Sequence, residues 1–306
     1  MPRVSKLLSY LLTLTIVTVC GTGACAAQDT VYFPSADGRT EIVGYVFKPD
    51  GPGPFPAIVM LHGRAGPYSS RVSRDCALVQ RAQPSPCNAA SLSQRHLMWG
   101  NFWSQRGILA IHVDSFGPRG AGHGFGRSTH DDPQRDSVNE RAVRPLDADG
   151  ALAYLRTRSD VRRESVALQG WSNGASTALN VMYRQAINAA SNAASNADGS
   201  TGFAAALVFY PGCGPAALLS QRYQAGAPLT VFLAADDEEV SAVSCRKVLS
   251  GAPAGPGKVD VVWYDGATHG FDDPGRERQS VAANQRASID AIKRSAEVIG
   301  AALMRR

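Results

Sequence analysis

Short apolar runs alternate with amphipathic segments along most of this chain. The apolar runs predict β-strands, and the longer uninterrupted ones are typical of strands buried on both faces. These runs span residues 31–33, 42–47, 57–61, 108–113, 166–168, 204–209, 229–234 and 259–263. Helices are predicted at residues 95–106, 145–156, 175–190 and 280–304. In the last helix, we expect one buried face that carries Ile289, Ile292, Ala296 and Ile299.

This alternation predicts an α/β protein with a mostly parallel central sheet and helices on both faces. Active sites in such sheets lie at the carboxyl ends of the strands. No linker interrupts residues 28–306, so we expect a single domain. The long polar stretch 64–93 and the Gly-rich loop 117–126 are expected to shape a pocket. The biased segment 188–199 is interpreted as a fraying helix end that runs into a flexible loop.

The N-terminal segment, residues 1–27, is typical of an export signal. Arg3 and Lys6 precede an uncharged, largely apolar run at residues 7–19, and the segment ends in Ala24-Cys25-Ala26-Ala27. The run is shorter than the ~20 residues that span a bilayer. A retained anchor helix is the alternative. Lipidation of Cys25 is less favoured, because the residues before it lack a leucine. The mature protein is therefore expected to be periplasmic or extracellular.

Composition limits the classes of partner. Hydrophobic residues make up 44% of the chain and charged residues 19%, which suits a globular domain with a substantial core. The formal charge is only +5, and the signal carries two of the positive residues. The basic residues are scattered, so nucleic acid is not an expected partner. No metal or organic cofactor is implied, no stable membrane association is expected after signal cleavage, and a monomer is the default.

Four of the six cysteines, Cys76, Cys87, Cys213 and Cys245, lie outside the signal. An even number of cysteines in an exported protein predicts disulfides. Three pairings can be drawn. Cys76 with Cys87 is favoured because the two are close in sequence and bracket a Pro-containing loop, which leaves Cys213 with Cys245. Four free, buried thiols are the alternative.

The most specific chemical signal is Gly170-Trp171-Ser172-Asn173-Gly174. This G-x-S-x-G motif directly follows a predicted strand and precedes a predicted helix, which is the context of a nucleophilic serine on a sharp turn. The flanking glycines remove side chains that would collide with the neighbouring strand and helix. The alternative is a Gly-rich turn without chemistry. In the catalytic interpretation, Ser172 is the nucleophile.

A serine hydroxyl needs a base, and the base needs an orienting acid. Of the six histidines, only His269 follows Ser172, as the chain order of this kind of site requires, and it lies after the strand at residues 259–263. The acid should follow the strand at 229–234, where strand placement alone leaves Asp236 and Asp237 open. The remaining acidic residues there are expected to form a solvated turn.

Stabilising the tetrahedral intermediate requires two N–H donors. The backbone N–H of Asn173, directly after the nucleophile, is one candidate. The backbone N–H of Arg64, in the loop after the strand at 57–61, is the other. His62, in the same loop, is interpreted as a structural residue rather than a catalytic one.

Three further segments resemble the dienelactone hydrolase family of α/β-hydrolases. They are Val113-Asp114-Ser115-Phe116-Gly117-Pro118-Arg119-Gly120, Phe209-Tyr210-Pro211-Gly212-Cys213-Gly214, and the loop from Tyr264 to Asp272 around His269. The resemblance implies the α/β-hydrolase fold. It also favours Asp237 as the acid, because relatives carry a cysteine eight positions after the catalytic aspartate, as Cys245 follows Asp237 here.

Two departures from the family pattern bear on the substrate. Dienelactone hydrolase itself uses a cysteine nucleophile, whereas this chain has Ser172. The family's substrate-binding arginine, four positions after the histidine, is Asp273 here. A serine esterase is therefore favoured over a dienelactone hydrolase. Arg119 and Trp171 are candidates for contact with the substrate, and Arg119 is equally well interpreted as a structural residue.

Together these features predict an exported serine hydrolase that cleaves a carboxylic ester through an acyl-enzyme. The substrate would be a small or polymeric ester. Alternatives on the same fold are an esterase directed at a polyester or a feruloylated polysaccharide, a serine exopeptidase, and a non-catalytic binding protein.

Overall fold

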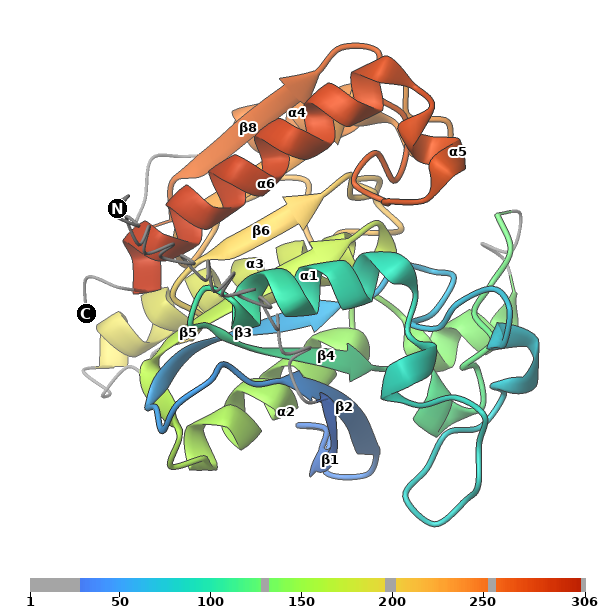
Figure 1. The fold of residues 1–306 in the computed structure, drawn as a ribbon. Coiled ribbons are helices and arrows are strands. Elements are labelled where there is room, and N and C mark those ends of the chain that lie inside the picture. The colour runs from blue at the N-terminus through green and yellow to red at the C-terminus, as the bar shows by residue number, and fades with distance from the viewer. Residues whose placement is uncertain (1–27, 128–131, 196–201, 253–256, 304–306) are drawn as a thin grey trace, which may run out of the picture.

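The fold is seen in a computed structural model, which describes residues 28–127, 132–195, 202–252 and 257–303 (Figure 1). The expected export signal, residues 1–27, lies outside the described residues, as do part of the biased segment and Met304. No helix in the described ranges is long and apolar enough to cross a membrane.

Eight strands form one sheet in the order β1-β2-β4-β3-β5-β6-β7-β8. Strands β1, β2 and β4 pair antiparallel, and every pair from β4 to β8 is parallel. The strands are β1 (Gln28–Pro34), β2 (Glu41–Phe47), β3 (Phe55–Leu61), β4 (Leu109–Asp114), β5 (Val161–Trp171), β6 (Ala206–Phe209), β7 (Leu229–Ala234) and β8 (Val259–Tyr264). The predicted fold class, a mostly parallel sheet between helices, is confirmed.

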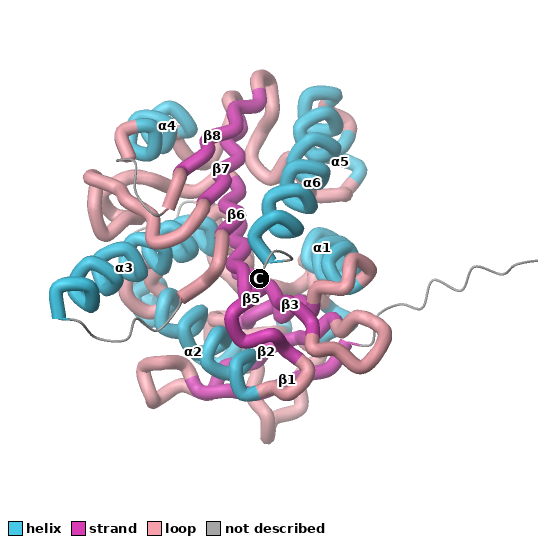
Figure 2. The backbone as a smooth tube through the Cα atoms, turned by 90° about the vertical axis from the view of Figure 1, so that its left-hand side faces the viewer, coloured by secondary structure: helices cyan, strands magenta, loops and turns pink. Residues whose placement is uncertain are grey.

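Helices cover both faces of this sheet (Figure 2). On one face lie α2 (Arg144–Thr157), α3 (Asn173–Ser195) and α4 (Ala242–Ser250). On the other lie α1 (Gln94–Ser104), the short α5 (Arg276–Gln279) and α6 (Ala282–Leu303). Single turns of 3₁₀-helix occur at Ser73–Asp75, Ala89–Ser91 and Gly117–Arg119, with a longer 3₁₀ segment at Pro133–Val138. Two apolar cores result, one on each face of the sheet.

All predicted strands and helices are present, with shifted ends. Strand β5 begins at Val161, well before the predicted 166. Its first half was not predicted because it is polar and partly exposed. Helix α4 was not predicted, since it is short and rich in polar residues. The predicted buried face of α6 is wrong in one respect. Ile299 is buried, but Ile289 is 71% exposed, and Ala287, Ala291 and Ser295 line the buried stripe instead.

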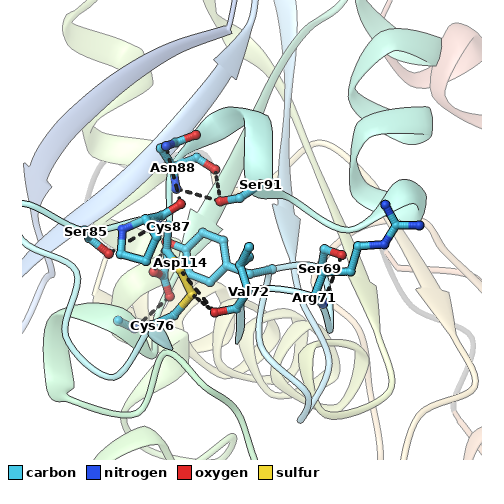
Figure 3. The surroundings of a disulfide bond; sticks show 12 residues. Ser69, Arg71, Val72, Cys76, Ser85, Cys87, Asn88, Ser91 and Asp114 are labelled. Atoms are coloured by element: carbon cyan, nitrogen blue, oxygen red, sulfur yellow. Dashed lines mark hydrogen bonds between the residues drawn. A yellow bond between two sulfur atoms is a disulfide. The ribbon is translucent and has the colours of Figure 1, made fainter. Parts of the chain in front are cut away.

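Both favoured disulfides are present. Cys76–Cys87 closes the long loop between β3 and α1 (Figure 3), where Asn88 and Ser91 brace the chain by exchanging hydrogen bonds. Cys213–Cys245 joins the loop after β6 to α4. The second disulfide therefore fastens two segments that follow neighbouring strands at the carboxyl edge of the sheet.

Candidate active site

Ser172 lies on a strained turn between β5 and α3. Its φ is 52°, a left-handed backbone conformation that few residues other than glycine adopt. The turn is tight on both sides. A Cβ on Gly174 would lie 2.2 Å from the Leu61 carbonyl oxygen, and one on Gly170 would lie 2.3 Å from the Gly174 carbonyl oxygen. The glycines of the motif are thus required for packing, and the turn raises Ser172 at the carboxyl end of the sheet.

His269 and Asp237 lie in line with this serine. His269, in the loop after β8, has its Nε2 3.0 Å from Ser172 Oγ. Its Nδ1 is 2.8 Å from Asp237 Oδ2 and 3.0 Å from Oδ1. The arrangement fits a neutral imidazole that donates from Nδ1 to Asp237 and accepts the serine hydroxyl proton at Nε2. Three loops, after β5, β7 and β8, bring the three residues together.

The structure separates Asp237 from Asp236. Asp237 is also held by the backbone N–H groups of Glu239 and Val240, which donate to its Oδ1 at 2.8 and 2.9 Å. Asp236 uses its backbone N–H to bond the Ala267 carbonyl, at 2.9 Å. Of these two aspartates, Asp237 is the one whose carboxylate is bonded to the imidazole.

Glu238 supports the backbone of the histidine loop. Its Oε2 accepts the backbone N–H of His269 at 2.9 Å, and its Oε1 accepts from Arg278 Nη1 at 2.7 Å. Partial burial works against the charged form, but these hydrogen bonds outweigh it and lower the pKa of Glu238 to about 2. Glu238 is thus a carboxylate at neutral pH. From the sequence, Glu238 was expected only as part of a solvated acidic turn, and its support of the histidine loop was not predicted.

Asp272 is a second anchor of the histidine loop that the sequence did not reveal. This buried carboxylate accepts hydrogen bonds from the indole N–H groups of Trp99 and Trp171, each at 2.8 Å, and from the Tyr210 hydroxyl. The Tyr210 ring lies 4.7 Å from that of His269, measured between centroids. The expectation that Trp171 contacts substrate is corrected here, because its side chain is fully buried and turned toward Asp272.

The two expected oxyanion donors belong to the two segments next to Ser172, the start of α3 and the loop after β3. Asn173 begins α3, and the first N–H groups of a helix have no acceptor within the helix. The Arg64 N–H likewise has no backbone or side-chain acceptor in the described part of the chain. Gly63, directly before it, packs on Ser172, since a Cβ there would be 3.3 Å from Ser172 Cβ.

A buried arginine bridges the two segments that carry these donors. Arg144, on α2, donates from Nη1 to the Asn173 side-chain oxygen and from Nη2 to the His62 carbonyl, the latter at 2.7 Å. Its side chain is fully buried. Burial lowers the pKa of Arg144 to about 10, which leaves the guanidinium charged at neutral pH. No sequence motif pointed to this residue.

His62 supports the same loop from the core. Its Nδ1 lies 2.7 Å from the Gly63 carbonyl oxygen, and its Nε2 accepts the Ser115 N–H at 3.3 Å. Burial lowers the pKa of His62 well below its usual value, so the ring is neutral. This geometry agrees with the structural interpretation of His62. The His112 ring stacks behind it in the interior, and the His96 ring packs against His112 at a tilt.

A pocket of about 390 Å³ opens beside Ser172. Its walls come mainly from the loops after β6 and β7, together with Arg127, Arg135 and Glu140. The expectation that residues 64–93 and 117–126 shape the pocket holds only for Arg64, because no other residue of these two segments lines it. Charged side chains of both signs line this pocket: Arg64, Arg127, Arg135, Glu140, Glu238 and Glu239.

Arg119 does not line this pocket, which corrects its expected role as a substrate contact. Its two terminal nitrogens donate to the two carboxylate oxygens of buried Asp147, each at 2.8 Å. Its Nη1 also donates to the Ser115 carbonyl at 2.8 Å. Arg119 therefore joins the loop after β4 to α2. Within the described ranges, no group of three or more His, Cys, Asp or Glu side chains is placed to hold a metal ion.

The fold and the serine turn define the chain as an α/β-hydrolase. The sequence matches the model of the dienelactone hydrolase family over residues 132–303, more than half of its length. The chain belongs to that family. No curated protein matches the sequence.

Solved structures of the same fold are similar over nearly the whole chain. A dienelactone hydrolase-like promiscuous phosphotriesterase from metagenomic libraries is 17% identical, with a TM-score of 0.61 over 91% of this chain and 99% of that one. A putative dienelactone hydrolase from Klebsiella pneumoniae subsp. pneumoniae is 13% identical, with a TM-score of 0.62 over 90% and 99%. Esterase 2 of Thermogutta terrifontis is 17% identical, with a TM-score of 0.58 over 90% and 94%. At these identities the likeness establishes the fold.

Proposed function

We propose that this member of the family is a serine hydrolase that cleaves carboxylic esters through an acyl-enzyme. The observation that carries the proposal is the unbroken contact from Ser172 Oγ to His269 Nε2 and from His269 Nδ1 to Asp237. In this mechanism, His269 takes the serine proton as Oγ attacks the ester carbonyl. The imidazolium is stabilised by Asp237 and then gives its proton to the departing alcohol. Water next attacks the acyl-serine, and the acid is released.

The oxyanion would form between the N–H groups of Asn173 and Arg64. The positive end of the α3 dipole adds to the stabilisation of negative charge there. Arg144 keeps the two segments in place and adds a full positive charge behind them. In other serine hydrolases, the removal of one preorganised donor of this kind lowers kcat about 10²–10³-fold.

The pocket favours a short substrate. Its volume of about 390 Å³ suits a small ester, and its walls carry paired charges that a long acyl chain would have to desolvate. We therefore expect acetyl and propionyl esters to be cleaved faster than octanoyl or longer ones. A polymeric ester with short side groups fits the same walls, since only the reacting group must enter.

The test is hydrolysis of p-nitrophenyl esters from acetate to decanoate by the mature protein and its Ser172→Ala variant. Activity should be lost in the variant and should decline with chain length. The Thermogutta terrifontis enzyme has a structure described as phosphorylated by paraoxon. Treatment of this protein with paraoxon should likewise add one diethylphosphoryl group to Ser172 with release of p-nitrophenol, and peptide mass spectrometry detects the added group. Hydrolysis that survives the Ser172→Ala substitution would overturn the serine mechanism.

We also propose that the protein acts outside the cytoplasm. Its two disulfides are typical of proteins from oxidising compartments, and residues 1–27 have the composition of an export signal. Fusing residues 1–27 to a reporter and fractionating the cells tests this. A reporter that stays in the cytoplasm at its full length would contradict it.

A further inference from the structure

A second carboxylate lies close to His269, on the side opposite Asp237. Glu239 Oε2 is 3.6 Å from His269 Nε2, the nitrogen that also faces Ser172. Glu239 lines the same pocket as Ser172, and its side chain is 10% exposed. The imidazole therefore has Asp237 at its Nδ1 and Glu239 near its Nε2, two residues apart on the loop after β7.

The Glu239 carboxylate is held firmly in this place. Arg64 Nε donates to Oε2 at 3.0 Å, and Arg64 Nη2 donates to Oε1 at 2.9 Å. Arg127 Nε lies 3.0 Å from Oε1. Two guanidinium groups thus fix the position of this side chain. Arg64 Nη2 also lies 2.9 Å from Oε2. A carboxylate offers about four acceptor positions, and the arginine N–H groups occupy three of them, so Glu239 retains the capacity to accept one more hydrogen bond.

The distance between Glu239 and His269 fits a water molecule that bridges the two side chains better than a direct hydrogen bond. At 3.6 Å, Oε2 is beyond the usual hydrogen-bond distance to Nε2. A water molecule beside the two atoms could give one hydrogen to each. Such a place, next to Ser172 Oγ, is where the water that attacks an acyl-serine must lie.

Acylation and deacylation differ in what they require here. The serine hydroxyl has one hydrogen, which goes to His269, so acylation leaves nothing for Glu239 to accept. The attacking water has two hydrogens. One goes to His269 Nε2, and the other needs an acceptor inside the pocket, because an unmatched polar hydrogen there costs free energy.

We propose that Glu239 orients the hydrolytic water by accepting a hydrogen bond from its second hydrogen. This inference rests on the proposed serine mechanism. The water oxygen bonds to the acyl carbon, and one water proton moves to His269 Nε2. The bond from the acyl carbon to Ser172 Oγ then breaks, and Oγ takes that proton back. The second hydrogen stays on the product acid, so Glu239 is a hydrogen-bond acceptor throughout and never a base.

The experiment compares the Glu239→Gln variant with the wild-type protein on p-nitrophenyl acetate, with and without methanol. Glutamine keeps the size, and its amide oxygen faces the arginines, so an N–H group replaces the acceptor near His269. We expect kcat to fall about tenfold, the effect of one lost hydrogen bond to a charged group, while kcat/KM stays within about twofold. Apparent KM should fall with kcat, and p-nitrophenol should appear as a burst of one equivalent.

Methanol supplies the diagnostic readout. It has a single hydroxyl hydrogen, which His269 takes, so methanolysis of the acyl-enzyme does not need Glu239. The ratio of methyl acetate to acetate should therefore rise about tenfold in the variant, in step with the loss of hydrolysis. The matched control is Arg127→Gln, which breaks the same ion-pair network but leaves the Glu239 carboxylate. It should keep the wild-type product ratio.

The alternative is that Glu239 only holds Arg64 and its oxyanion N–H. In that case kcat and kcat/KM would fall together and the product ratio would not change, which overturns the inference. If the Gln variant does not fold, Glu239→Asp withdraws the carboxylate by one methylene and must raise the same ratio. An unchanged ratio there is equally decisive. Failure of the serine mechanism itself would appear separately, as wild-type turnover that persists in Ser172→Ala.

Discussion

The two sides of Ser172 are held by different kinds of interaction. On the oxyanion side, one fully buried guanidinium, Arg144, joins the loop after β3 to the start of α3. On the base side, several partly exposed charges share the task. The side chains of Glu238 and Arg278 are 35% and 28% exposed, and Asp272 anchors the far end of the same loop.

This difference predicts how each side responds to change. Arg144 is the only charged side chain, in the described ranges, that bonds both segments at once. Its removal leaves a carbonyl and an amide oxygen buried without a donor. On the base side, solvent can replace a lost partner, and the Asp272 anchor remains. The oxyanion side should therefore be sensitive to a single substitution, and the base side tolerant.

The largest effect is expected for Arg144→Met. Losing both hydrogen bonds in a dry site should reduce the free energy of unfolding by about 2–4 kcal/mol and kcat by about 10²-fold. Arg119→Met is the matched control, because Arg119 is also a largely buried arginine, paired with buried Asp147, but does not bond Asn173 or the His62 carbonyl. It should cost similar stability and leave kcat of the folded protein within about twofold. Urea unfolding and steady-state kinetics on both variants make the comparison. Equal losses of kcat in Arg144→Met and Arg119→Met would contradict the expected role of Arg144 at the oxyanion side.

The next prediction concerns the core behind the oxyanion side, where His62, His96 and His112 are buried. Burial lowers the pKa of all three, to about 3 for His96. The folded protein thus keeps these rings neutral while the unfolded chain binds protons below about pH 6.5. Their contribution to stability is present above that pH and is lost as the pH falls toward 3. The free energy of unfolding should therefore be lower at pH 5.5 than at pH 7.5.

His112→Phe isolates one of these rings. Neither nitrogen of His112 has a hydrogen-bond partner in the described part of the chain. The substitution should reduce by about 1.4 kcal/mol the difference in the free energy of unfolding between pH 7.5 and pH 5.5. This is the value for one histidine that takes up a proton in the unfolded chain with a pKa of about 6.5 and does not take one up in the folded protein. Comparing two pH values cancels any packing change. Burial raises the pKa of nearby Asp114, which acts with the opposite sign, but equally in both proteins. An unchanged difference would mean that His112 does not oppose protonation.

The smallest effect is expected on the base side, for Arg278→Gln. The ion pair with Glu238 is partly exposed, so its loss should lower the free energy of unfolding by less than about 1 kcal/mol at pH 7. The change should shrink further at 0.5 M salt, because salt screens exposed charges. Thermal unfolding at two salt concentrations measures it. A loss as large as that of Arg144→Met would erase the contrast between the two sides.

The strands, the fold and the order of the three central residues could be predicted because each depends on local pattern. Apolar runs mark the strands, and the glycines around Ser172 mark its turn. Arg144 could not be predicted in this way. Its partners are 29 and 82 residues away, and no spacing or motif connects them. Glu239 and Arg64, which are 175 residues apart, are a stronger example.

The wrong expectations have a common cause. Trp171 lies next to Ser172 in sequence, and Arg119 lies in a loop that resembles a family segment, but neither position fixes where a side chain points. The Trp171 side chain enters the core beside Asp272, and that of Arg119 turns to α2. The long loop closed by Cys76–Cys87 contributes only Arg64 to the pocket, whereas the loop that holds Cys213 forms one of its walls.

The left-handed backbone at Ser172 means that the fold and the chemistry favour different residues at this position. A residue with a side chain loses about 1–2 kcal/mol in that conformation, whereas glycine does not. A mutational scan selected only for thermal resistance should therefore enrich glycine at position 172. In the proposed mechanism, the strain is the loss of stability that accompanies the placing of a serine hydroxyl on this turn.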